Sequence, residues 1–568
     1  RQFSTAMNAV VVKSTEQQAM ATLRNLQGVK RVYRSEMRYA MMDDSLSRMK
    51  IEGAWADAGG RDMAGEGVRI AIIDSGIRPE NPMFTNTGLA PASELPSDDY
   101  CSTTDATFCT DKVIVARYSE PTFTVHENEH ISPLDYSGHG THVAGSAAGA
   151  YVAANYLGSE VNLSGVAPGA YIMAYKALFT TPTSPGGGSD AMLVEALEHA
   201  LNDGADVINN SWGGGPGQDG TDSVYDTIFA NAEAAGVVVV TAAGNDGSGA
   251  ETIGCPGCVE AGITVAALDE TRTFSQKVSF NGSEFDARIA SGDFVVTENI
   301  EGPLVLAANV SEGNELGCTA FSENAFAGAI AMVTRGECSF VEKAQNVQAA
   351  GAIAMVVGNN ESGLIGMALD GITLPSVMVS QSTAEAIAES YEAGDALTIQ
   401  TIEAETIADS AMGIASFSSR GPNGNNSFLK PDIAAPGTSI LSAYSPDQGA
   451  TFALNSGTSM ASPHVAGAAA LLRQLRPELD AYQVKSVLMG TTRLLANTTI
   501  FEQGTGLVQV DNALAATFAL DKGAYVNSDC RLTCTFTMEV TNLTDEAKGY
   551  MVTASRLDYV EISVDVGG

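Results

Sequence analysis

Positive charge is scarce in this sequence. Of 568 residues only 30 are Lys or Arg, whereas 67 are Asp or Glu, which gives a formal net charge of −37. Nucleic-acid binding depends on clustered Lys and Arg that contact phosphates, so the composition argues against a nucleic-acid partner. It suits a soluble protein that works in salt, where repulsion between surface charges is screened.

Long apolar segments are missing as well. No run is long enough to cross a bilayer, and the first residues, RQFSTAMN, contain no signal peptide. If the protein is secreted, we expect its export signal to have been removed already. Hydrophobic residues make up 45% of the chain and charged residues 17%, which is typical of a globular protein. The length predicts about two to four domains.

The eight cysteines fall into four local pairs. An even count with close spacing indicates disulfides and an oxidising compartment. The pairs are Cys101 with Cys109, Cys255 with Cys258, Cys318 with Cys338, and Cys530 with Cys534. Spacing alone leaves the connectivity open, and CPGC at 255–258 also matches half of a redox or metal motif. No second C-x-x-C accompanies it, which favours a disulfide within a loop.

Short apolar runs alternate with amphipathic segments in the first half of the chain. Helical patterns at 190–204 and 222–236 separate runs that read as buried strands, at 68–74, 171–178, 206–212, 237–245 and 262–268. This alternation predicts a parallel sheet covered on both faces. Ligands of such sheets bind beyond the carboxyl ends of the strands. The residues that follow three of the strands, Asp74, Ser211 and Asn245, are therefore candidates for a site.

The α/β pattern breaks after Phe274 and returns at about residue 411. The intervening segment contains GAIAMV twice, at 328–333 and 351–356, around a helical pattern at 341–351. These three elements predict a strand–helix–strand unit inside an inserted domain. From about Asp521 the chain is polar and β-patterned, which predicts a short C-terminal β segment.

Four of the six histidines lie within residues 126–145. The first two, His126 and His130, form HENEH, which matches the H-E-x-x-H pattern of zinc peptidases. That pattern requires both imidazoles on one face of a helix. Pro121 and Pro133 bracket the stretch and no helical period surrounds it, so a polar surface loop is the favoured interpretation.

Three other motifs supply a carboxylate, an imidazole and a hydroxyl. IAIIDSGI ends a strand with Asp74, SGHGTHVAG contains His139, and NSGTSMASPHVAG contains Ser459 at the start of an apolar helix. Each residue alone has a structural explanation, such as a turn, a core histidine or a helix cap. Together they provide a nucleophile, a base near neutral pH and a carboxylate that orients the base. The start of the Ser459 helix directs N–H groups towards developing negative charge.

These motifs and their Asp–His–Ser order resemble the subtilisin-like serine proteases, the subtilases. The resemblance covers about residues 48–275 and 411–515 and implies that Asp74, His139 and Ser459 are the catalytic triad. TAAGNDG (241–247) is similar to the oxyanion segment of the family, which implies that Asn245 is a donor. The likeness also implies residues that line the first substrate pocket, namely Ser211, Trp212, Gly213, Ala242, Ala243 and Gly244. His142 and His464 match positions that pack near the catalytic residues.

Two further segments resemble known modules. Residues 317–360 are similar to a protease-associated (PA) domain, which implies a Cys318–Cys338 disulfide and a role in substrate access. Residues 3–41 read strand, helix, strand and are similar to the second half of a subtilase inhibitor prosegment. The resulting boundaries are 1–42 for the prosegment, 43–275 with 411–518 for the catalytic domain, 276–410 for the PA domain and 519–568 for a partial β-sandwich-like segment.

The expected architecture is a three-layer α/β subtilisin-like fold with a mostly parallel sheet, the β-rich insert and the C-terminal β segment. The expected function is that of a secreted, extracellular serine endopeptidase acting on proteins and peptides, with its own prosegment as a partner. The alternatives are a zinc peptidase that uses His126 and His130, and a non-catalytic binding protein on the same fold. The chemistry requires no cofactor. The acidic surface is compatible with structural calcium, but residues 156–170 do not reproduce the family's calcium loop and no ligand set is readable.

Overall fold

The computed structural model describes most of the chain. The described residues are 2–3, 9–10, 44–85, 87–156, 159–217, 219–269, 272–292, 294, 296–361, 364, 367–369, 371–406, 413–423, 429–524 and 536–550. The chain divides into two compact units, Arg1–Met41 and Met42–Gly568. In the first unit, β1 (Gln2–Phe3) pairs antiparallel with β2 (Ala9–Val10). The predicted helix and second strand of the prosegment lie outside the described residues.

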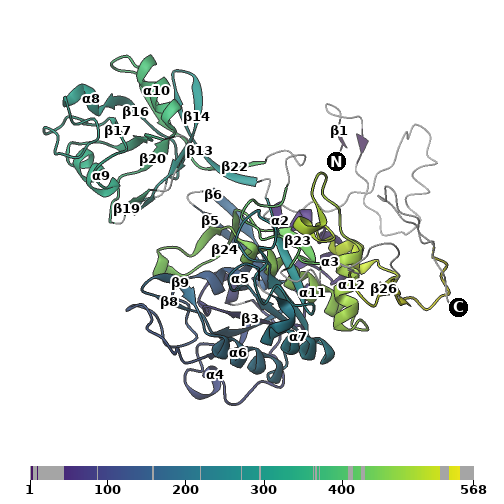
Figure 1. Cartoon of the computed structure of the whole chain (residues 1–568). Helices are drawn as coiled ribbons and strands as arrows, with labels where there is room; N and C mark the ends of the chain where they lie inside the picture. The colour runs from purple at the N-terminus through teal and green to yellow at the C-terminus, as the bar shows by residue number, and fades with distance from the viewer. Residues whose placement is uncertain are drawn as a thin grey trace. The chain divides into compact units, whose positions relative to one another are not determined.

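A sheet of seven parallel strands forms the centre of the second unit (Figure 1). In spatial order the strands are β23 (Ile433–Pro436), β12 (Ile263–Leu268), β11 (Val238–Ala242), β10 (Val207–Asn210), β3 (Arg69–Asp74), β7 (Tyr171–Lys176) and β4 (Val113–Tyr118). Every residue of β12 and β7 is buried, as expected for strands covered on both faces. The five strands predicted from the apolar runs are all present, and the α/β fold is confirmed.

Helices cover both faces of this sheet and complete the three layers. Side chains of β3 alternate between two hydrophobic clusters, because successive residues of a strand point to opposite faces. Ile70 and Ile72 pack in the cluster that contains α5 (His139–Ala148) and α11 (Thr458–Leu475). Ala71 and Ile73 pack in the cluster that contains residues of α6 (Asp190–Asn202) and α7 (Val224–Ala234).

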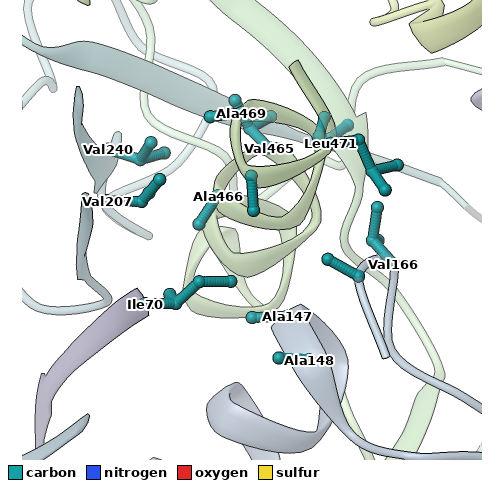
Figure 2. Close-up of a cluster of buried hydrophobic side chains, with 14 of the residues drawn as sticks. Ile70, Ala147, Ala148, Val166, Val207, Val240, Val465, Ala466, Ala469 and Leu471 are labelled. Carbon is teal, nitrogen blue, oxygen red and sulfur yellow. The ribbon is translucent and has the colours of Figure 1, made fainter. Parts of the chain in front are cut away.

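The central helix α11 packs closely because its buried face carries small residues. Figure 2 shows Ala466 and Ala469 of α11 among Ile70, Val207 and Val240 of the sheet, with Ala147 and Ala148 of α5 nearby. A Cβ atom on Gly467 would lie only 2.7 Å from the Ala147 carbonyl oxygen. The run of Ala and Gly after Ser459 therefore lets the α11 backbone approach α5 and the sheet.

Smaller elements surround the central layers. The helices are α2 (Asp44–Arg48), α3 (Glu52–Asp57), α4 (Tyr100–Thr103), α12 (Ala481–Gly490), α13 (Ile500–Gln503) and α14 (Val510–Leu514). Antiparallel pairs are formed by β5 (Val152–Tyr156) with β6 (Ser159–Leu163), β8 (Phe179–Thr181) with β9 (Ser184–Gly187), and β24 (Ile440–Ala443) with β25 (Phe452–Asn455). No helix in the described ranges combines the length and apolarity needed to cross a membrane.

The described part of the predicted C-terminal β segment is a single strand pair. β26 (Phe518–Leu520) pairs antiparallel with β27 (Val540–Asn542). Cys530 and Cys534, predicted to form a disulfide, lie outside the described residues.

The insert contains a ring of seven strands. β14 (Ser283–Ile289), β20 (Ser376–Val379), β18 (Ala354–Gly358), β17 (Ile330–Thr334), β16 (Ile300–Leu306), β21 (Ala396–Ile399) and β13 (Arg272–Phe280) follow one another in the sheet. β13 also pairs with β14, which closes the ring, and β22 (Glu403–Thr406) pairs with the start of β13. Ser275 and Glu403 are partners in that last pair, so the chain enters and leaves the insert through neighbouring strands.

Each of the seven strands of the ring contributes hydrophobic side chains to one buried cluster. Its strand members include Val278, Ala287, Leu304, Ile330, Val356, Val377 and Leu397. Helix α10 (Gln381–Ser390) adds Ile387 to this cluster, whereas α9 (Phe340–Ala349) packs in a second one. The predicted strand–helix–strand unit is confirmed as β17, α9 and β18. Two short strands, β15 (Ser291–Gly292) and β19 (Ala368–Leu369), pair in parallel, and α8 spans Ala307–Val310.

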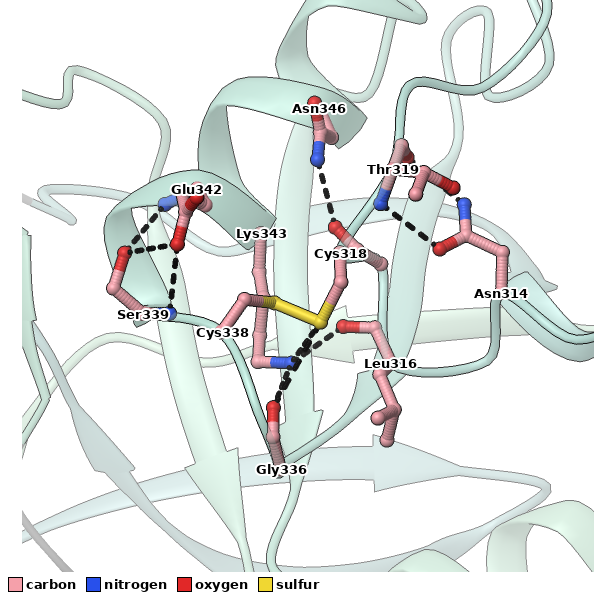
Figure 3. Close-up of a disulfide and its surroundings, with 11 residues drawn as sticks. Asn314, Leu316, Cys318, Thr319, Gly336, Cys338, Ser339, Glu342, Lys343 and Asn346 are labelled. Carbon is pink, nitrogen blue, oxygen red and sulfur yellow. Dashed lines mark hydrogen bonds between the residues drawn. A yellow bond between two sulfur atoms is a disulfide. The ribbon is translucent and has the colours of Figure 1, made fainter.

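A disulfide joins Cys318 to Cys338 at the start of α9 (Figure 3). The buried ammonium of Lys343 donates to the carbonyl oxygens of Leu316 at 2.6 Å and Gly336 at 2.9 Å. Because a buried charge needs hydrogen-bond partners, these contacts fix the loops that carry the two cysteines. Burial lowers the pKa of Lys343.

Candidate active site

Asp74 and His139 are adjacent at the carboxyl end of the central sheet. Asp74 is the last residue of β3 and is fully buried, and His139 is the first residue of α5. His139 Nδ1 lies 2.7 Å from Asp74 Oδ1, which also accepts the Ser75 backbone N–H at 2.7 Å. A carboxylate only accepts hydrogen bonds, so Nδ1 carries the proton and Nε2 has a free lone pair. The pair is therefore arranged as a base with its orienting carboxylate.

A glycine allows α5 to begin this close to β3. A Cβ atom at Gly140 would collide with the Gly76 carbonyl oxygen and lie 3.1 Å from Asp74 Cβ. Any larger residue at Gly140 would push the start of α5, and with it His139, away from Asp74. The glycine after the histidine in GHGTH thus has a steric role in the site.

Asp135 holds the first turn of α5, although the sequence analysis did not single it out. Its carboxylate is buried and accepts the backbone N–H groups of Gly138 and Thr141, each at 2.9 Å. It also accepts the hydroxyl of Thr141 at 2.6 Å and that of Ser75 at 3.0 Å. Asp135 therefore binds N–H groups that a helix start leaves unpaired and links α5 to the residue after Asp74.

The environment of His139 favours its protonated form. Burial opposes the charge and lowers the pKa, but the charge of Asp74 and the hydrogen bond to it outweigh burial, so the pKa of His139 is raised. The side chain is 34% exposed, so solvent weakens both effects. His139 is thus a stronger base than an isolated imidazole.

Ser459 is the second residue of α11 and lies beside the strand end of β10. Its hydroxyl donates to the Ser211 carbonyl oxygen at 3.0 Å, and the Ser211 hydroxyl donates to the Ser459 carbonyl oxygen at 2.8 Å. Among the residues that the structure describes, no hydrogen bond joins Ser459 to His139. The hydroxyl must leave the Ser211 carbonyl before His139 can accept its proton. Such loose geometry is common in an unliganded site.

Asn245 follows β11 on an exposed loop and points its amide towards the start of α11. Its Oδ1 accepts both the backbone N–H and the hydroxyl of Thr458, each at 3.0 Å. A Cβ atom added to Gly457 would lie 3.5 Å from Asn245 Nδ2 and 3.6 Å from the Ser459 backbone nitrogen. The two nitrogen donors therefore border the same small space next to Ser459.

Two hydroxyl groups accept hydrogen bonds from the backbone of the loop that carries Asn245, one on each side of this residue. Thr458 Oγ1 accepts the Gly244 N–H at 3.1 Å, and Ser419 Oγ accepts the Asp246 N–H at 3.1 Å. Both side chains are completely buried. Thr458 and Ser419 thus fix the position of Asn245, and the sequence analysis assigned neither of them a function.

A cleft of about 1140 Å³ opens at these elements. Five of the predicted site residues line it, namely Asp74, His139, Ser211, Trp212 and Gly213. The other five, Ser459, Asn245, Ala242, Ala243 and Gly244, are not part of its lining; Ala242 and Ala243 are buried at the end of β11. The lining also includes residues outside the predicted set, among them Leu178, Leu193, Tyr225 and Cys255.

The HENEH stretch forms a loop, as the sequence analysis favoured, and its side chains have other partners. His130 Nε2 lies 2.6 Å from Asp447 Oδ2, and His126 stacks on Tyr136 with 5.5 Å between ring centroids. Glu129 is buried in an ion pair with Lys176 at 2.8 Å. This arrangement does not present two imidazoles and a free carboxylate to a metal ion.

His142 and His464 are buried in the helices that carry His139 and Ser459. His142 Nε2 donates to the carbonyl oxygen of Ile440 at 2.9 Å, and His464 Nδ1 donates to that of Met460 at 2.7 Å. Burial lowers the pKa of His142 to about 3 and that of His464 to about 4. Both imidazoles are therefore neutral near pH 7 and pack as structural groups.

Two further disulfides join Cys101 to Cys109 and Cys255 to Cys258. The described residues contain one cluster of three potential metal ligands, formed by Asp99, Cys101 and Cys109. Both of its sulfur atoms are bonded to each other, so the cluster offers no thiolate to a metal.

The family model for subtilases matches residues 65–507, which is more than half of the chain. The chain belongs to the subtilase family. This confirms the membership inferred from the three motifs, and the matched range includes every element that carries Asp74, His139, Asn245 and Ser459.

Known proteins similar to this subtilase include bacterial and plant members of the family. It is 33% identical over 503 residues to the minor extracellular protease Vpr of Bacillus subtilis (strain 168), an alignment that covers 85% of this chain and 55% of Vpr. It is 31% identical over 471 residues to the subtilisin-like protease SBT1.4 of Arabidopsis thaliana, an alignment that covers 77% of this chain and 58% of SBT1.4. For the subtilisin-like protease SBT1.3 of the same plant the identity is 30% over 531 residues, and the alignment covers 86% of this chain and 65% of SBT1.3. The chain thus spans little more than half to two thirds of the length of these relatives.

Proposed function

We propose that this subtilase is a serine endopeptidase that hydrolyses peptide bonds in proteins through an acyl-enzyme intermediate on Ser459. The main support is the hydrogen bond of 2.7 Å between His139 and Asp74 at the end of β3, in a cleft whose wall includes Ser211, the hydrogen-bond partner of Ser459. The names of the relatives, which call them proteases, agree with this activity.

In the proposed reaction Ser459 attacks the carbonyl carbon of the scissile peptide bond. His139 Nε2 takes the hydroxyl proton, and Asp74 stabilises the resulting imidazolium through Nδ1. The imidazolium then protonates the leaving amine, which leaves an ester on Ser459. A water molecule gives its proton to His139 and attacks the ester; the imidazolium then returns the proton to Ser459 Oγ as the acid leaves. General-base catalysis of this kind contributes about a hundred- to ten-thousandfold.

Asn245 Nδ2 and the Ser459 backbone N–H are the proposed donors to the oxyanion. Both donors border the space beside Gly457. The Oδ1 atom of the Asn245 amide accepts hydrogen bonds from Thr458, which leaves Nδ2 directed towards this space. Fixed donors of this type stabilise the charge that develops in the transition state without having to reorganise. The N-terminus of α11, an 18-residue helix, adds its positive dipole end at the same position.

The peptide backbone of the substrate is proposed to pair with the segment that begins at Ser211. A substrate N–H that donates to the Ser211 carbonyl oxygen would take the place of the Ser459 hydroxyl, which occupies this acceptor in the free protein. Binding would then release the nucleophile towards His139. Main-chain pairing of this type gives affinity with little dependence on sequence, so the pocket near Trp212 would supply the side-chain preference.

Secretion is part of the proposal. One relative is named an extracellular protease, and the disulfides between Cys101 and Cys109, Cys255 and Cys258, and Cys318 and Cys338 are of a kind that persists in oxidising compartments. The strongly acidic composition suits a soluble protein in salt. The proposed chemistry uses only protein groups and needs no cofactor.

The insert and the N-terminal segment have proposed roles that rest on resemblance. The insert, similar to a PA domain, would control the access of large substrates to the cleft. Residues 1–42 would be the remnant of an inhibitor prosegment that is cut within AMMDD at 40–44. N-terminal sequencing of active enzyme tests the second role. A single start at Arg1 with full activity would contradict it.

The Ser459→Ala variant tests the proposed function. It should lose hydrolysis of casein and of chromogenic peptide amides while its circular dichroism remains that of the wild type. Ser456→Ala is the matched control, because this exposed serine lies three residues earlier and outside the proposed catalytic groups. Hydrolysis by Ser459→Ala at a rate close to that of the control would refute the proposal.

A further inference from the structure

The disulfide loop Cys255–Cys258 lies against the segment proposed to bind substrate. Cys255 borders the cleft, and its carbonyl oxygen accepts the Gly214 N–H at 2.7 Å. Gly213 is also close, because a Cβ atom there would lie 3.4 Å from the same oxygen. The cysteine is thus bound to the backbone that continues from Ser211 through Trp212.

The loop is equally close to the strand that leads to Asn245. A Cβ atom on Gly257 would lie 2.8 Å from the Ala242 carbonyl oxygen at the end of β11. The carbonyl of Gly257 accepts the buried hydroxyl of Thr264 on β12 at 2.8 Å. The four-residue ring closed by the disulfide therefore lies against both segments that the family resemblance assigns to the first pocket.

Close packing makes the position of these segments depend on the shape of the ring. A Cβ atom on Gly254 would overlap the Gly214 carbonyl oxygen, and one on Gly220 would overlap that of Cys258. Cys255 and Cys258 share a buried cluster with Ala243 and Tyr225. Closely packed backbones without intervening side chains transmit a change in loop conformation directly to their neighbours.

We propose that the Cys255–Cys258 disulfide positions the first substrate pocket and that its reduction by a small dithiol reversibly weakens peptide binding. This inference rests on the proposed protease function. The cross-link restricts the loop to conformations that keep Gly214 bonded to Cys255. Once the cross-link is open, the loop and the substrate-binding segment are free to move, whereas Ser459, His139 and Asp74 are held by α11, α5 and β3.

The redox step is thiol–disulfide exchange from the side of the cleft. Cys255 borders the cleft and is 8% exposed, whereas Cys258 is completely buried. A thiolate of the dithiol attacks Cys255 Sγ and forms a mixed disulfide, and Cys258 leaves as a thiolate that takes up a proton. The second thiol of the reagent then displaces Cys255. Two electrons pass to the protein, and the dithiol becomes a cyclic disulfide.

The first test replaces both cysteines. Cys255→Ser/Cys258→Ser should raise KM for a chromogenic peptide with a large side chain before the scissile bond by about tenfold, with kcat changed by less than about twofold. A small fluorophosphonate that does not fill the pocket should inactivate the variant at the rate of the wild type. A KM within twofold of the wild-type value would overturn the positioning role.

The second test keeps the wild-type sequence and uses dithiothreitol. KM should rise in step with the alkylation of Cys255 and Cys258 measured by mass spectrometry, and return after reoxidation. The matched control is Cys318→Ser/Cys338→Ser, which removes the disulfide of the insert (Figure 3) and should respond to the reagent as the wild type does. Loss of the response in this control, or no change in KM with both cysteines alkylated, would overturn the proposal. Failure of excess reagent to open the Cys255–Cys258 bond would overturn its redox part.

Fluorophosphonate titration separates this proposal from the proposed function. Normal titration of Ser459 together with an unchanged KM refutes only the role of the disulfide. A wild-type enzyme that cleaves peptides without being titrated refutes the assignment of Ser459 itself.

Discussion

Thr458→Val should slow the chemical step through its effect on Asn245. The hydroxyl of Thr458 donates to Asn245 Oδ1 at 3.0 Å and accepts the Gly244 N–H at 3.1 Å, and valine has the same shape without either hydrogen bond. A hydrogen bond contributes about 0.5–1.5 kcal/mol net, so the loss of two bonds destabilises the position of the proposed oxyanion donor by about 1–3 kcal/mol. Because about 1.4 kcal/mol corresponds to a tenfold change in rate, kcat should fall roughly 5- to 150-fold.

The fall should remain smaller than that caused by removing the donor. The backbone N–H of Thr458 still binds Asn245 Oδ1 at 3.0 Å in the variant, whereas Asn245→Ala deletes the amide and should cost about a hundred- to a thousandfold. Steady-state kinetics on a small peptide amide measure both effects, with KM expected to change little. Thr458→Ser retains the hydroxyl and is the matched control.

The two substitutions should not be additive. In the Asn245→Ala background, Thr458→Val should have almost no further effect on kcat, since the donor it positions is already gone. A full additional loss in the double variant, or wild-type kcat in Thr458→Val alone, would refute the positioning of Asn245 by Thr458.

Three further predictions concern pH and the insert. Because Asp74 raises the pKa of His139 above 6.5, kcat/KM should decrease with unit slope as pH falls below that pKa. A pH–rate profile with an optimum near pH 4 would exclude His139 as the base. The low pKa values of His142 and His464, about 3 and about 4, mean that the unfolded chain binds more protons below about pH 6.5. The free energy of unfolding of Ser459→Ala in urea should therefore decrease from about pH 6.5 towards 4, by up to about 1.4 kcal/mol per pH unit for each histidine; a flat curve over this range would contradict their burial as neutral groups. Replacing residues 276–402 by a short glycine-rich turn should preserve cleavage of small peptides and reduce cleavage of folded proteins, and an equal loss on both would make the insert part of the catalytic core.

The central sheet could be predicted because its strands are apolar on both faces. Runs such as 68–74 and 262–268 have no polar face, and the helical patterns between them predict the crossovers of a parallel sheet. The position of Asp74 at a carboxyl strand end followed from that sheet alone. The assignment of His139 and Ser459 required the motif order as well, since nothing in the local pattern brings residues 65 and 385 positions from Asp74 to one place.

The residues that hold the site were harder to predict because they act through backbone atoms of distant segments. Asp135 binds the start of α5 from three residues before the N-cap Gly138, so the usual capping position does not identify it. Thr458 and Ser419 bind opposite sides of the Asn245 loop from elements far along the chain. Their hydroxyl groups carry no periodic pattern, so only the packed structure identifies their partners.

The contact between Cys255 and Gly214 could not be predicted from the sequence pattern either. The spacing of CPGC favoured a loop disulfide, and the structure contains one. The hydrogen bond from the Gly214 N–H to the Cys255 carbonyl oxygen depends on how two loops from neighbouring strands pack, which the sequence pattern does not describe.

Covalent labelling tests the central claim most directly. A fluorophosphonate should modify one serine, Ser459, as mapped by peptide mass spectrometry, and the rate of labelling should decrease as pH falls through the pKa of His139. Ser459→Ala should take up no label, and His139→Ala should label far more slowly. Labelling of a different serine, or a protein that hydrolyses peptides at full rate while Ser459 stays unmodified in excess reagent, would contradict the account.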